Sequence, residues 1–178
     1  MKAKIAGTIV IVIILSIAGL MYFAVTHVQV FTVPIETLDK NVQTTKMYDV
    51  VDVVDGDTID IAINGKKERV RYIGMDTPEI VDSTKLKSCF GVEASKRNSE
   101  LVRGKKVALV KDVSERDKYG RLLRYVYVDG EFVNLELVQE GFARSLTISP
   151  DVAHSNVFMT AERSAREKNL GLWATCKI

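Results

Sequence analysis

The sequence predicts an α+β domain, a closed barrel of five β-strands with three α-helices, preceded by one N-terminal transmembrane helix. Two observations predict the domain. Five short runs rich in Val, Ile and Tyr are bounded by turn signals, and three other runs place apolar residues at helical spacing. A third observation, an uncharged apolar run near the N-terminus, predicts the transmembrane helix.

The first three strands are expected between Tyr48 and Glu79. The run YDVVDVVDGDTIDIAING alternates apolar and polar residues through a turn, which indicates two strands. Its last residues and the next lysine, Asn64–Lys66, are typical of a tight hairpin turn. The returning strand is KERVRYIGMDTPE, which Pro78 stops. The runs KKVALVKDV and RLLRYVYVDGEFV predict two more strands.

The helices follow the third and fifth strands. Apolar residues recur at helical spacing from Cys89 to Val102, and Gly104 ends that helix. The run VNLELVQEGFA predicts a short amphipathic helix that ends at Gly141. After Pro150, SNVFMTAERSAREKNLGLW predicts one last helix with charges of alternating sign on its outer face. Five strands with much local pairing fit a small barrel of the OB type.

The N-terminal run from Ile5 to Val25 has no charged residue and is long enough to cross a bilayer. Lys2 and Lys4 precede it and no Lys or Arg follows before Lys40, so the N-terminus should stay in the cytoplasm and the rest should be exported. A cleaved signal peptide, followed by secretion, is the alternative. We therefore expect a membrane anchor at 1–25, a linker at 26–46 and the globular domain at 47–178.

Charge and cysteine content indicate which kinds of binding site the domain can have. The formal net charge of +2 leaves the exported part nearly neutral, so any anion must be bound by a few placed residues rather than by a basic field. The two cysteines, Cys89 and Cys176, permit a disulfide outside the cell, although two buried thiols would fit equally. Two cysteines without a neighbouring histidine do not suggest a zinc site.

Carboxylates gather at the ends of two neighbouring strands. Asp57 lies at the start of one strand and Asp76 at the end of the next, so a hairpin register would let them face each other. Two carboxylates at close range repel unless a cation lies between them, and Ca²⁺ prefers oxygen ligands. Acids at strand ends are more often simple turn residues. Glu79 follows on the loop fixed by Pro78, and Arg71 lies on the same strand as Asp76.

Several motifs, in order, resemble the staphylococcal nuclease (thermonuclease) family. They are VVDGDTIDI, VRYIGMDTPE, CFGVEAS, ERDKYGRLLRYVYVDGEFVNLELVQEGFA and AERSARE before GLW, and they span about Met47 to Trp173. The family fold is an OB barrel with three helices, which agrees with the elements predicted above. The resemblance implies a Ca²⁺-dependent phosphodiesterase that cleaves DNA and RNA on the 5′ side of the phosphate and leaves 3′-phosphate ends.

The resemblance also implies the roles of single residues. The metal ligands fall on Asp57, Asp76 and the backbone carbonyl of Thr77. The catalytic residues fall on Glu79, Arg71 and Arg121, and the substrate-binding pair falls on Lys118 and Tyr119. We expect a monomer whose partners are nucleic acid and, through the N-terminal helix, a membrane. This sequence departs from the type member in two respects. SLTISP after EGFAR lacks the tyrosines that stack on the nucleotide base in the type member, and the type member has no counterparts of Cys89 and Cys176.

Two other classes of function stay open. In the first, the domain is a catalytically silent OB module that binds nucleic acid. In the second, it is a structural envelope protein that keeps only the barrel. The acids and arginines that a silent module would be expected to lose are all present.

Overall fold

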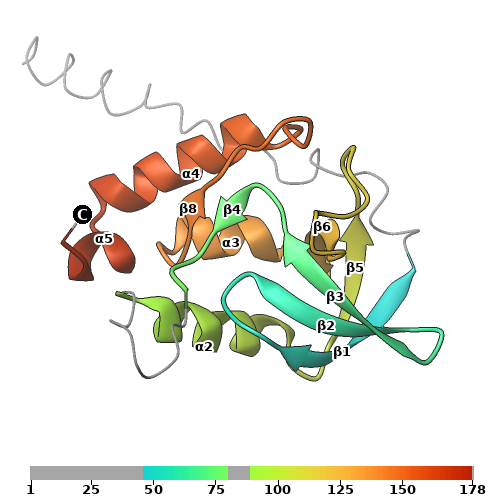
Figure 1. Ribbon diagram of the computed structural model, residues 1–178. Coiled ribbons are helices and arrows are strands. Elements are labelled where there is room, and N and C mark those ends of the chain that lie inside the picture. The colour runs from blue at the N-terminus through green and yellow to red at the C-terminus, as the bar shows by residue number, and fades with distance from the viewer. Residues whose placement is uncertain (1–45, 80–88, 178) are drawn as a thin grey trace, which may run out of the picture. The chain divides into compact units, whose positions relative to one another are not determined.

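A computed structural model describes residues 46–79 and 89–177, and its five longest strands close into a barrel (Figure 1). The strands run in the order β3-β2-β1-β5-β6, and a parallel pairing of β3 with β6 joins the two ends. Their bounds are Met47–Val53 (β1), Thr58–Ile63 (β2), Lys66–Tyr72 (β3), Lys106–Val110 (β5) and Leu122–Val128 (β6). The predicted barrel of five strands is confirmed.

The hairpin between β2 and β3 forms where the sequence predicts it. Asn64 and Gly65 both have positive φ, 51° and 75°, as a two-residue hairpin turn that follows the strand twist requires. The antiparallel register pairs Thr58 with Arg71 and Ile63 with Lys66. In this register the start of β2, which follows Asp57, lies beside the end of β3, which carries Arg71.

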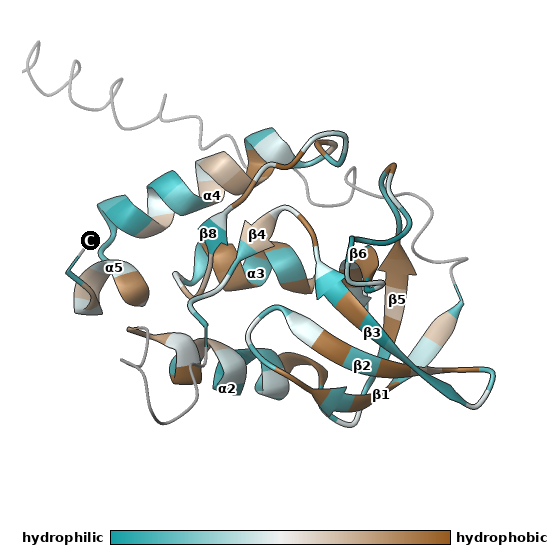
Figure 2. Ribbon diagram, in the orientation of Figure 1, coloured by the Kyte–Doolittle hydropathy of each residue, from teal (hydrophilic) through white to brown (hydrophobic). Residues whose placement is uncertain are grey.

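The barrel core follows from the alternation of apolar and polar residues along the strands (Figure 2). Ile59, Ile61, Val70, Tyr72 and Val126 are all at most 1% exposed. The phenol of Tyr72 donates a hydrogen bond to Oδ1 of Asn98, also fully buried, at 2.9 Å. A buried tyrosine hydroxyl needs such a partner, since an unpaired one costs free energy.

The helices pack against one another beside the barrel (Figure 1). Helix α3 (Val133–Gln139) contacts both α2 (Gly91–Val102) and α4 (Ser155–Glu167). The prediction of one last helix up to Trp173 is wrong, because a separate short helix, α5 (Leu172–Thr175), follows α4. Asn169 and Gly171, with φ of 51° and 53°, break the run. The described residues therefore hold four helices rather than three.

Three strands have two residues each, and none was predicted as a separate strand. They are β4 (Met75–Asp76), β7 (Glu131–Phe132) and β8 (Arg144–Ser145). The runs KERVRYIGMDTPE and RLLRYVYVDGEFV, each predicted as one strand, both divide in two, because β3 ends at Tyr72 and β6 at Val128. β4 pairs with β8, which places Asp76 opposite Arg144. This second small sheet fixes the segment that leaves the barrel with Asp76, Thr77 and Glu79.

The two cysteines form a disulfide with Cα atoms 5.8 Å apart. It joins the residues just before α2 to the end of α5. The predicted membrane helix at Ile5–Val25 and nearly all of the linker lie outside the described residues. Within 46–79 and 89–177, no helix has the length and apolar character needed to span a bilayer.

Candidate active site

Asp57 lies at the end of the tight turn between β1 and β2. The carboxylate of Asp55 accepts the backbone N–H of Asp57 at 3.0 Å, a local bond typical of aspartate in turns. Between them, Gly56 has no room for a side chain, because an added Cβ would lie 2.7 Å from the hydroxyl of Thr77. The DGD sequence therefore lets the turn approach the segment after β4.

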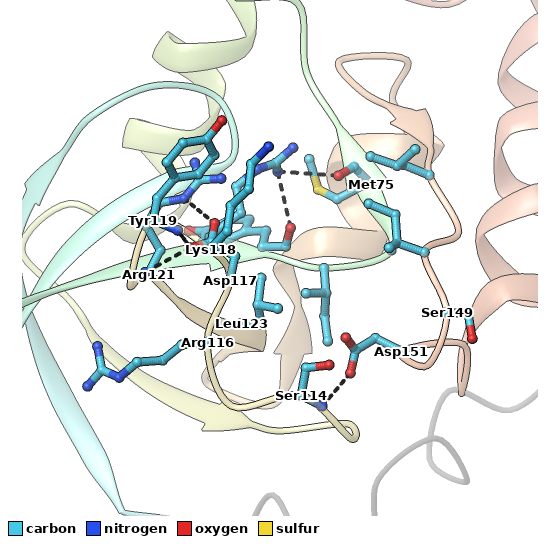
Figure 3. Close-up of a pocket in the computed structure, with 16 residues that line it drawn as sticks. Met75, Ser114, Arg116, Asp117, Lys118, Tyr119, Arg121, Leu123, Ser149 and Asp151 are labelled. Carbon is cyan, nitrogen blue, oxygen red and sulfur yellow. Dashed lines mark hydrogen bonds and ion pairs between the residues drawn. The ribbon is translucent and has the colours of Figure 1, made fainter.

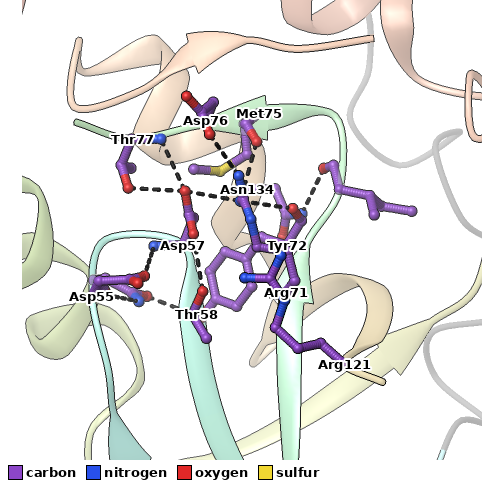
Figure 4. A network of polar contacts seen from close by, with 12 residues as sticks. Asp55, Asp57, Thr58, Arg71, Tyr72, Met75, Asp76, Thr77, Arg121 and Asn134 are labelled. Carbon is purple, nitrogen blue, oxygen red and sulfur yellow. Dashed lines mark hydrogen bonds and ion pairs between the residues drawn. The ribbon is translucent and has the colours of Figure 1, made fainter. Parts of the chain in front are cut away.

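The Asp57 carboxylate is buried, at 5% exposure, and is held by several donors (Figure 4). Its Oδ2 accepts the backbone N–H and the hydroxyl of Thr77, both at 2.9 Å, and its Oδ1 accepts the Thr58 hydroxyl at 3.0 Å. Hydrogen bonds of this kind offset the cost of burying a polar side chain. Asp57 is thereby fixed in position before any ligand binds.

Arg71 joins the two carboxylates that the sequence predicts to face each other (Figure 4). Its Nη1 lies 2.8 Å from Oδ2 of Asp57 and its Nη2 lies 2.6 Å from Oδ1 of Asp76. Nη1 also donates to the backbone carbonyl of Tyr72 at 3.1 Å. The guanidinium is only 13% exposed, whereas the Asp76 side chain is 48% exposed. The structure therefore brings Asp57, Arg71, Asp76 and Thr77 into one cluster, with Asp76 on its solvent side.

Negative charge accumulates at this cluster. Burial, with the neighbouring charge of Asp57, raises the pKa of Asp55 to about 6. Burial also raises the pKa of Asp76, while Arg71 opposes the change. Two carboxylates share one guanidinium, so a second cation would lower the electrostatic free energy of the cluster.

A second group of predicted residues lies on the loop before β6. Asp117 organises this loop: its carboxylate accepts the backbone N–H groups of Tyr119 and Arg121 at 2.9 and 3.0 Å and forms an ion pair with Nε of Arg121 at 2.7 Å. Tyr119 is 72% exposed. The Lys118 ammonium lies 5.0 Å and the Arg121 guanidinium 5.5 Å from the centre of its ring. Lys118, Tyr119 and Arg121 therefore form one cationic and aromatic group.

A groove of about 490 Å³ connects Arg71, but not Asp57 or Asp76, with the second group (Figure 3). Arg71 lines it together with Lys118, Tyr119 and Arg121. Leu146 and Ile148, from the SLTISP segment, also line it. This wall is therefore aliphatic. Among the described residues that line the groove, the aromatic ones are Tyr72, which is buried, and Tyr119, which is exposed.

Glu79 closes the first described segment, directly after Pro78, and is exposed. Its backbone carbonyl packs against Gly91, the first residue of α2. The contacts described above for Asp57, Arg71 and Asp76 do not include its carboxylate. Its role as the catalytic carboxylate stays a prediction.

The cluster has the donor chemistry that a hard divalent cation needs. Its donors are oxygens, and one of its two carboxylates reaches solvent. Two carboxylates also carry more negative charge than the single Arg71 guanidinium can neutralise. No three His, Cys, Asp or Glu side chains within 46–79 and 89–177 group closely enough to bind a metal by themselves. A cation here would need backbone oxygen or water besides Asp57 and Asp76. The described contacts of Thr77 use its amide and hydroxyl, so ligation by its carbonyl stays a prediction.

Sequence reasoning missed the residues that hold the site in place. Asp55 belongs to the DGD motif, and its spacing from Asp57 is a usable signal for a local turn bond. Asp117 precedes the KYGR motif and gives a similar signal. Asp151 accepts the N–H groups of Val113 and Ser114 at 3.0 and 2.7 Å. That bond joins distant segments, so no local pattern predicts it.

Comparisons with known proteins agree with this geometry. The family described as "Staphylococcal nuclease homologue" matches residues 69–175. Endonuclease YncB of Bacillus subtilis (strain 168) is 44% identical over 123 residues, 68% of this chain and 58% of that protein. SPbeta prophage-derived endonuclease YokF of the same organism is 43% identical over 123 residues, 68% of this chain and 42% of that protein.

A thermonuclease of Staphylococcus intermedius is 38% identical over 126 residues, 71% of this chain and 75% of that protein. The matched region therefore spans most of the thermonuclease but less than two thirds of the length of either Bacillus subtilis relative. The family match covers more than half of this chain and contains Arg71, Asp76, Glu79 and Arg121. The chain belongs to the family of staphylococcal nuclease homologues.

Proposed function

We propose that this protein is a Ca²⁺-dependent nuclease that hydrolyses phosphodiester bonds of DNA and RNA, with cleavage on the 5′ side of the phosphate and 3′-phosphate ends. The observation that carries the proposal is that Arg71, held by two carboxylates, lines the same groove as Arg121, Lys118 and Tyr119. Relatives named as endonucleases and thermonucleases support the same class of activity.

The arginines are suited to bind a phosphodiester and its transition state. Each presents a planar set of N–H donors, which matches two phosphoryl oxygens better than an ammonium does. Arg71 is fixed by Asp57 and Asp76, and Arg121 by Asp117, so neither must reorganise when charge develops on the phosphoryl oxygens. Their role is therefore electrostatic stabilisation of that charge.

Asp57 and Asp76, with the carbonyl of Thr77, would hold Ca²⁺ beside Arg71. A bound Ca²⁺ supplies further positive charge to a phosphoryl oxygen and helps to orient an attacking water. Glu79 would accept a proton from that water or hold it in position. The carboxylates of Asp57 and Asp76 then serve two purposes, since they bind the cation and hold Arg71 in place.

Lys118 and Tyr119 would bind the polynucleotide next to the scissile phosphate. The exposed ring can stack on a base of any sequence, and the lysine can pair with a neighbouring phosphate. The aliphatic wall formed by Leu146 and Ile148 adds apolar contact but no stacking. We further propose that residues 1–25 anchor the enzyme in the membrane, with secretion after cleavage as the alternative.

Hydrolysis of single-stranded DNA and of RNA by the full-length chain in detergent tests the proposal. We expect cleavage with Ca²⁺, loss of cleavage in excess chelator, and poor recovery with Mg²⁺, which requires a tighter octahedral shell. Analysis of the product ends checks for 3′-phosphates. Full activity in excess chelator would disprove the Ca²⁺ assignment. Binding of DNA without cleavage under every condition would instead favour a silent binding module.

A further inference from the structure

The backbone at Glu79 rests against the first turn of α2. A Cβ added to Gly91 would lie 2.5 Å from the carbonyl oxygen of Glu79 and 2.9 Å from that of Pro78. Only a glycine permits so close an approach, so the start of α2 is packed directly on the backbone that carries the proposed catalytic carboxylate. A displacement of α2 at this end would displace Glu79.

The disulfide fixes this same end of α2. Cys89 lies two residues before Gly91 and is joined to Cys176 at the end of α5. Phe90, between Cys89 and Gly91, has a positive φ of 75°, and the centre of its ring lies 5.4 Å from that of Phe142. The helix has no side-chain cap at this end, so the disulfide and the ring contact are side-chain contacts that hold it in position.

The other partner of the disulfide belongs to the frame that carries Asp76. Helix α5 is bound to the turn after α3, because the N–H of Leu172 donates to the carbonyl of Gly141 at 2.9 Å. That turn leads into β8, which pairs with β4 and places Arg144 opposite Asp76. Glu79 therefore follows a segment supported by β8 on one side and by α2 on the other, and the disulfide connects the two supports.

We infer that the Cys89–Cys176 disulfide is a positioning element for Glu79, in addition to any effect on stability; this inference rests on the proposed nuclease function. The strands that carry Asp57 and Arg71 are held by the barrel's own hydrogen bonds and do not depend on α5. Asp76 also keeps its own contacts without the disulfide, the β4–β8 pairing and the ion pair with Arg71. Loss of the disulfide should therefore leave substrate and cation binding intact and impair the step that needs Glu79. A misplacement of about 1 Å of a catalytic group can cost about 10²-fold in rate.

The full-length variant Cys89→Ser/Cys176→Ser tests this directly. We expect kcat on single-stranded DNA at saturating Ca²⁺ to fall about 10-fold or more, with KM within about twofold of the wild-type value. Arg97→Gln is the matched control. Arg97 also lies on α2, but it binds Glu136 of α3 and Glu140 directly after that helix, at 2.7 and 2.6 Å. The variant should lower stability without the same loss of kcat.

Gly91→Ala is a second variant that keeps the disulfide. Its methyl group must push the backbone of Glu79 away, so it should also lower kcat with little change in KM. Val92→Ala, an exposed neighbour on α2, is its control. This variant also tests the inference if the serine variant does not fold.

A double-mutant cycle with Glu79→Gln separates positioning from general structure. If the disulfide acts through Glu79, its removal should lower kcat much less in the Glu79→Gln background, where residual activity is measured at high enzyme concentration. An equal loss in both backgrounds, a change in KM alone, or wild-type kcat in the variants would overturn the inference. A wild-type protein that does not cleave DNA would instead refute the proposed function itself.

Discussion

Two arginines on β3 show how differently the same residue type is used. Arg71 is 13% exposed and contacts two carboxylates beside the groove. Arg69, two residues earlier, is 49% exposed and binds Asp60, by Nε at 2.9 Å and Nη2 at 3.2 Å. Asp60 is buried but also pairs with Lys67, so it keeps cationic partners when Arg69 is changed to lysine, and Arg69 does not line the groove. Arg69 is therefore a suitable reference for Arg71.

We predict that Arg71→Lys and Arg121→Lys each lower turnover by about 10²-fold, because lysine keeps the charge but loses the planar pair of donors. The folded state should persist in both variants. The measurement is the initial rate on single-stranded DNA at saturating Ca²⁺, alongside thermal unfolding, with Arg69→Lys as the control. Near-normal rates in both variants would show that these arginines are ordinary surface charges.

The exposed ring of Tyr119 should matter for binding rather than for folding. Tyr119→Leu removes a stacking surface worth about 1–3 kcal/mol per base and should raise KM about 10-fold. Since the ring is 72% exposed, thermal stability should not change measurably. Tyr48→Leu is the control, because Tyr48 also lies beside a lysine, Lys46, but does not line the groove. An unchanged KM for Tyr119→Leu would refute substrate binding by this ring.

At the scale of elements, two aspartates, Asp151 outside the loop before β6 and Asp112 within it, join that loop to neighbouring segments. Asp151 accepts two backbone N–H groups of this loop, from Val113 and Ser114. Asp112 accepts the Tyr125 hydroxyl at 3.0 Å and the N–H of Ala153 at 2.9 Å. The loop that carries Lys118, Tyr119 and Arg121 is thus joined to the segment before α4.

Asp151→Ala should lower the free energy of unfolding at neutral pH by about 1–3 kcal/mol, because two N–H groups lose their acceptor. Burial alone would raise the pKa of Asp151, but the hydrogen bonds from Ser114 and Val113 lower it below the ordinary 3.8. A lowered carboxyl pKa stabilises the folded state above the unfolded value, and that contribution is lost as the pH falls through the folded value.

The difference in unfolding free energy between wild type and Asp151→Ala should therefore shrink below about pH 4. Denaturant unfolding at several pH values measures it. Asp49→Ala, which removes an exposed pair with Lys106, is the control and should have little effect. A difference that does not depend on pH would mean that the charge of Asp151 is not involved.

The long elements were predictable from sequence, and the short ones were not. Alternation and the Asn64–Gly65 turn locate β2 and β3 because these signals are local. β4 and β8 have two residues each and pair only with each other, although they lie far apart in the sequence. β7 is the second arm of a short hairpin with β6 across Asp129 and Gly130, inside a run predicted as one strand. The motifs select Asp57, Arg71 and Asp76 correctly as neighbours. The bond from Asp151 to Ser114 joins residues 37 positions apart, which no local pattern encodes.

At the scale of the whole molecule, cation binding should stabilise the fold. Any ligand that binds only the folded state raises stability, by about 2.7 kcal/mol at 100 times its Kd. We predict that Ca²⁺ raises the unfolding temperature of the wild type and has little effect on Asp76→Asn, which loses one proposed ligand. Differential scanning fluorimetry across a Ca²⁺ titration measures this without any substrate. An equal shift in both proteins would place the cation elsewhere.

The N-terminal 25 residues predict that the domain is held at the membrane on its outer side. We expect the protein to sediment with membranes, and protease added to cells with opened outer layers to digest the domain. Replacing Ile5–Val25 by a known cleavable signal peptide is the control and should release the domain into the medium. A mature chain that begins after about residue 26 and is found in the medium would support secretion instead.

The parallel pairing of β3 with β6 has a consequence for when the proposed nuclease would become active. This pairing brings Val70 beside Leu122, and so brings the neighbourhoods of Arg71 and Arg121 together, only when the barrel closes. Contacts between segments so far apart in sequence form with the final cooperative folding of the chain. A chain exported before it folds would therefore be latent during synthesis, and would gain its activity only on the side of the membrane that does not hold the cell's own chromosome.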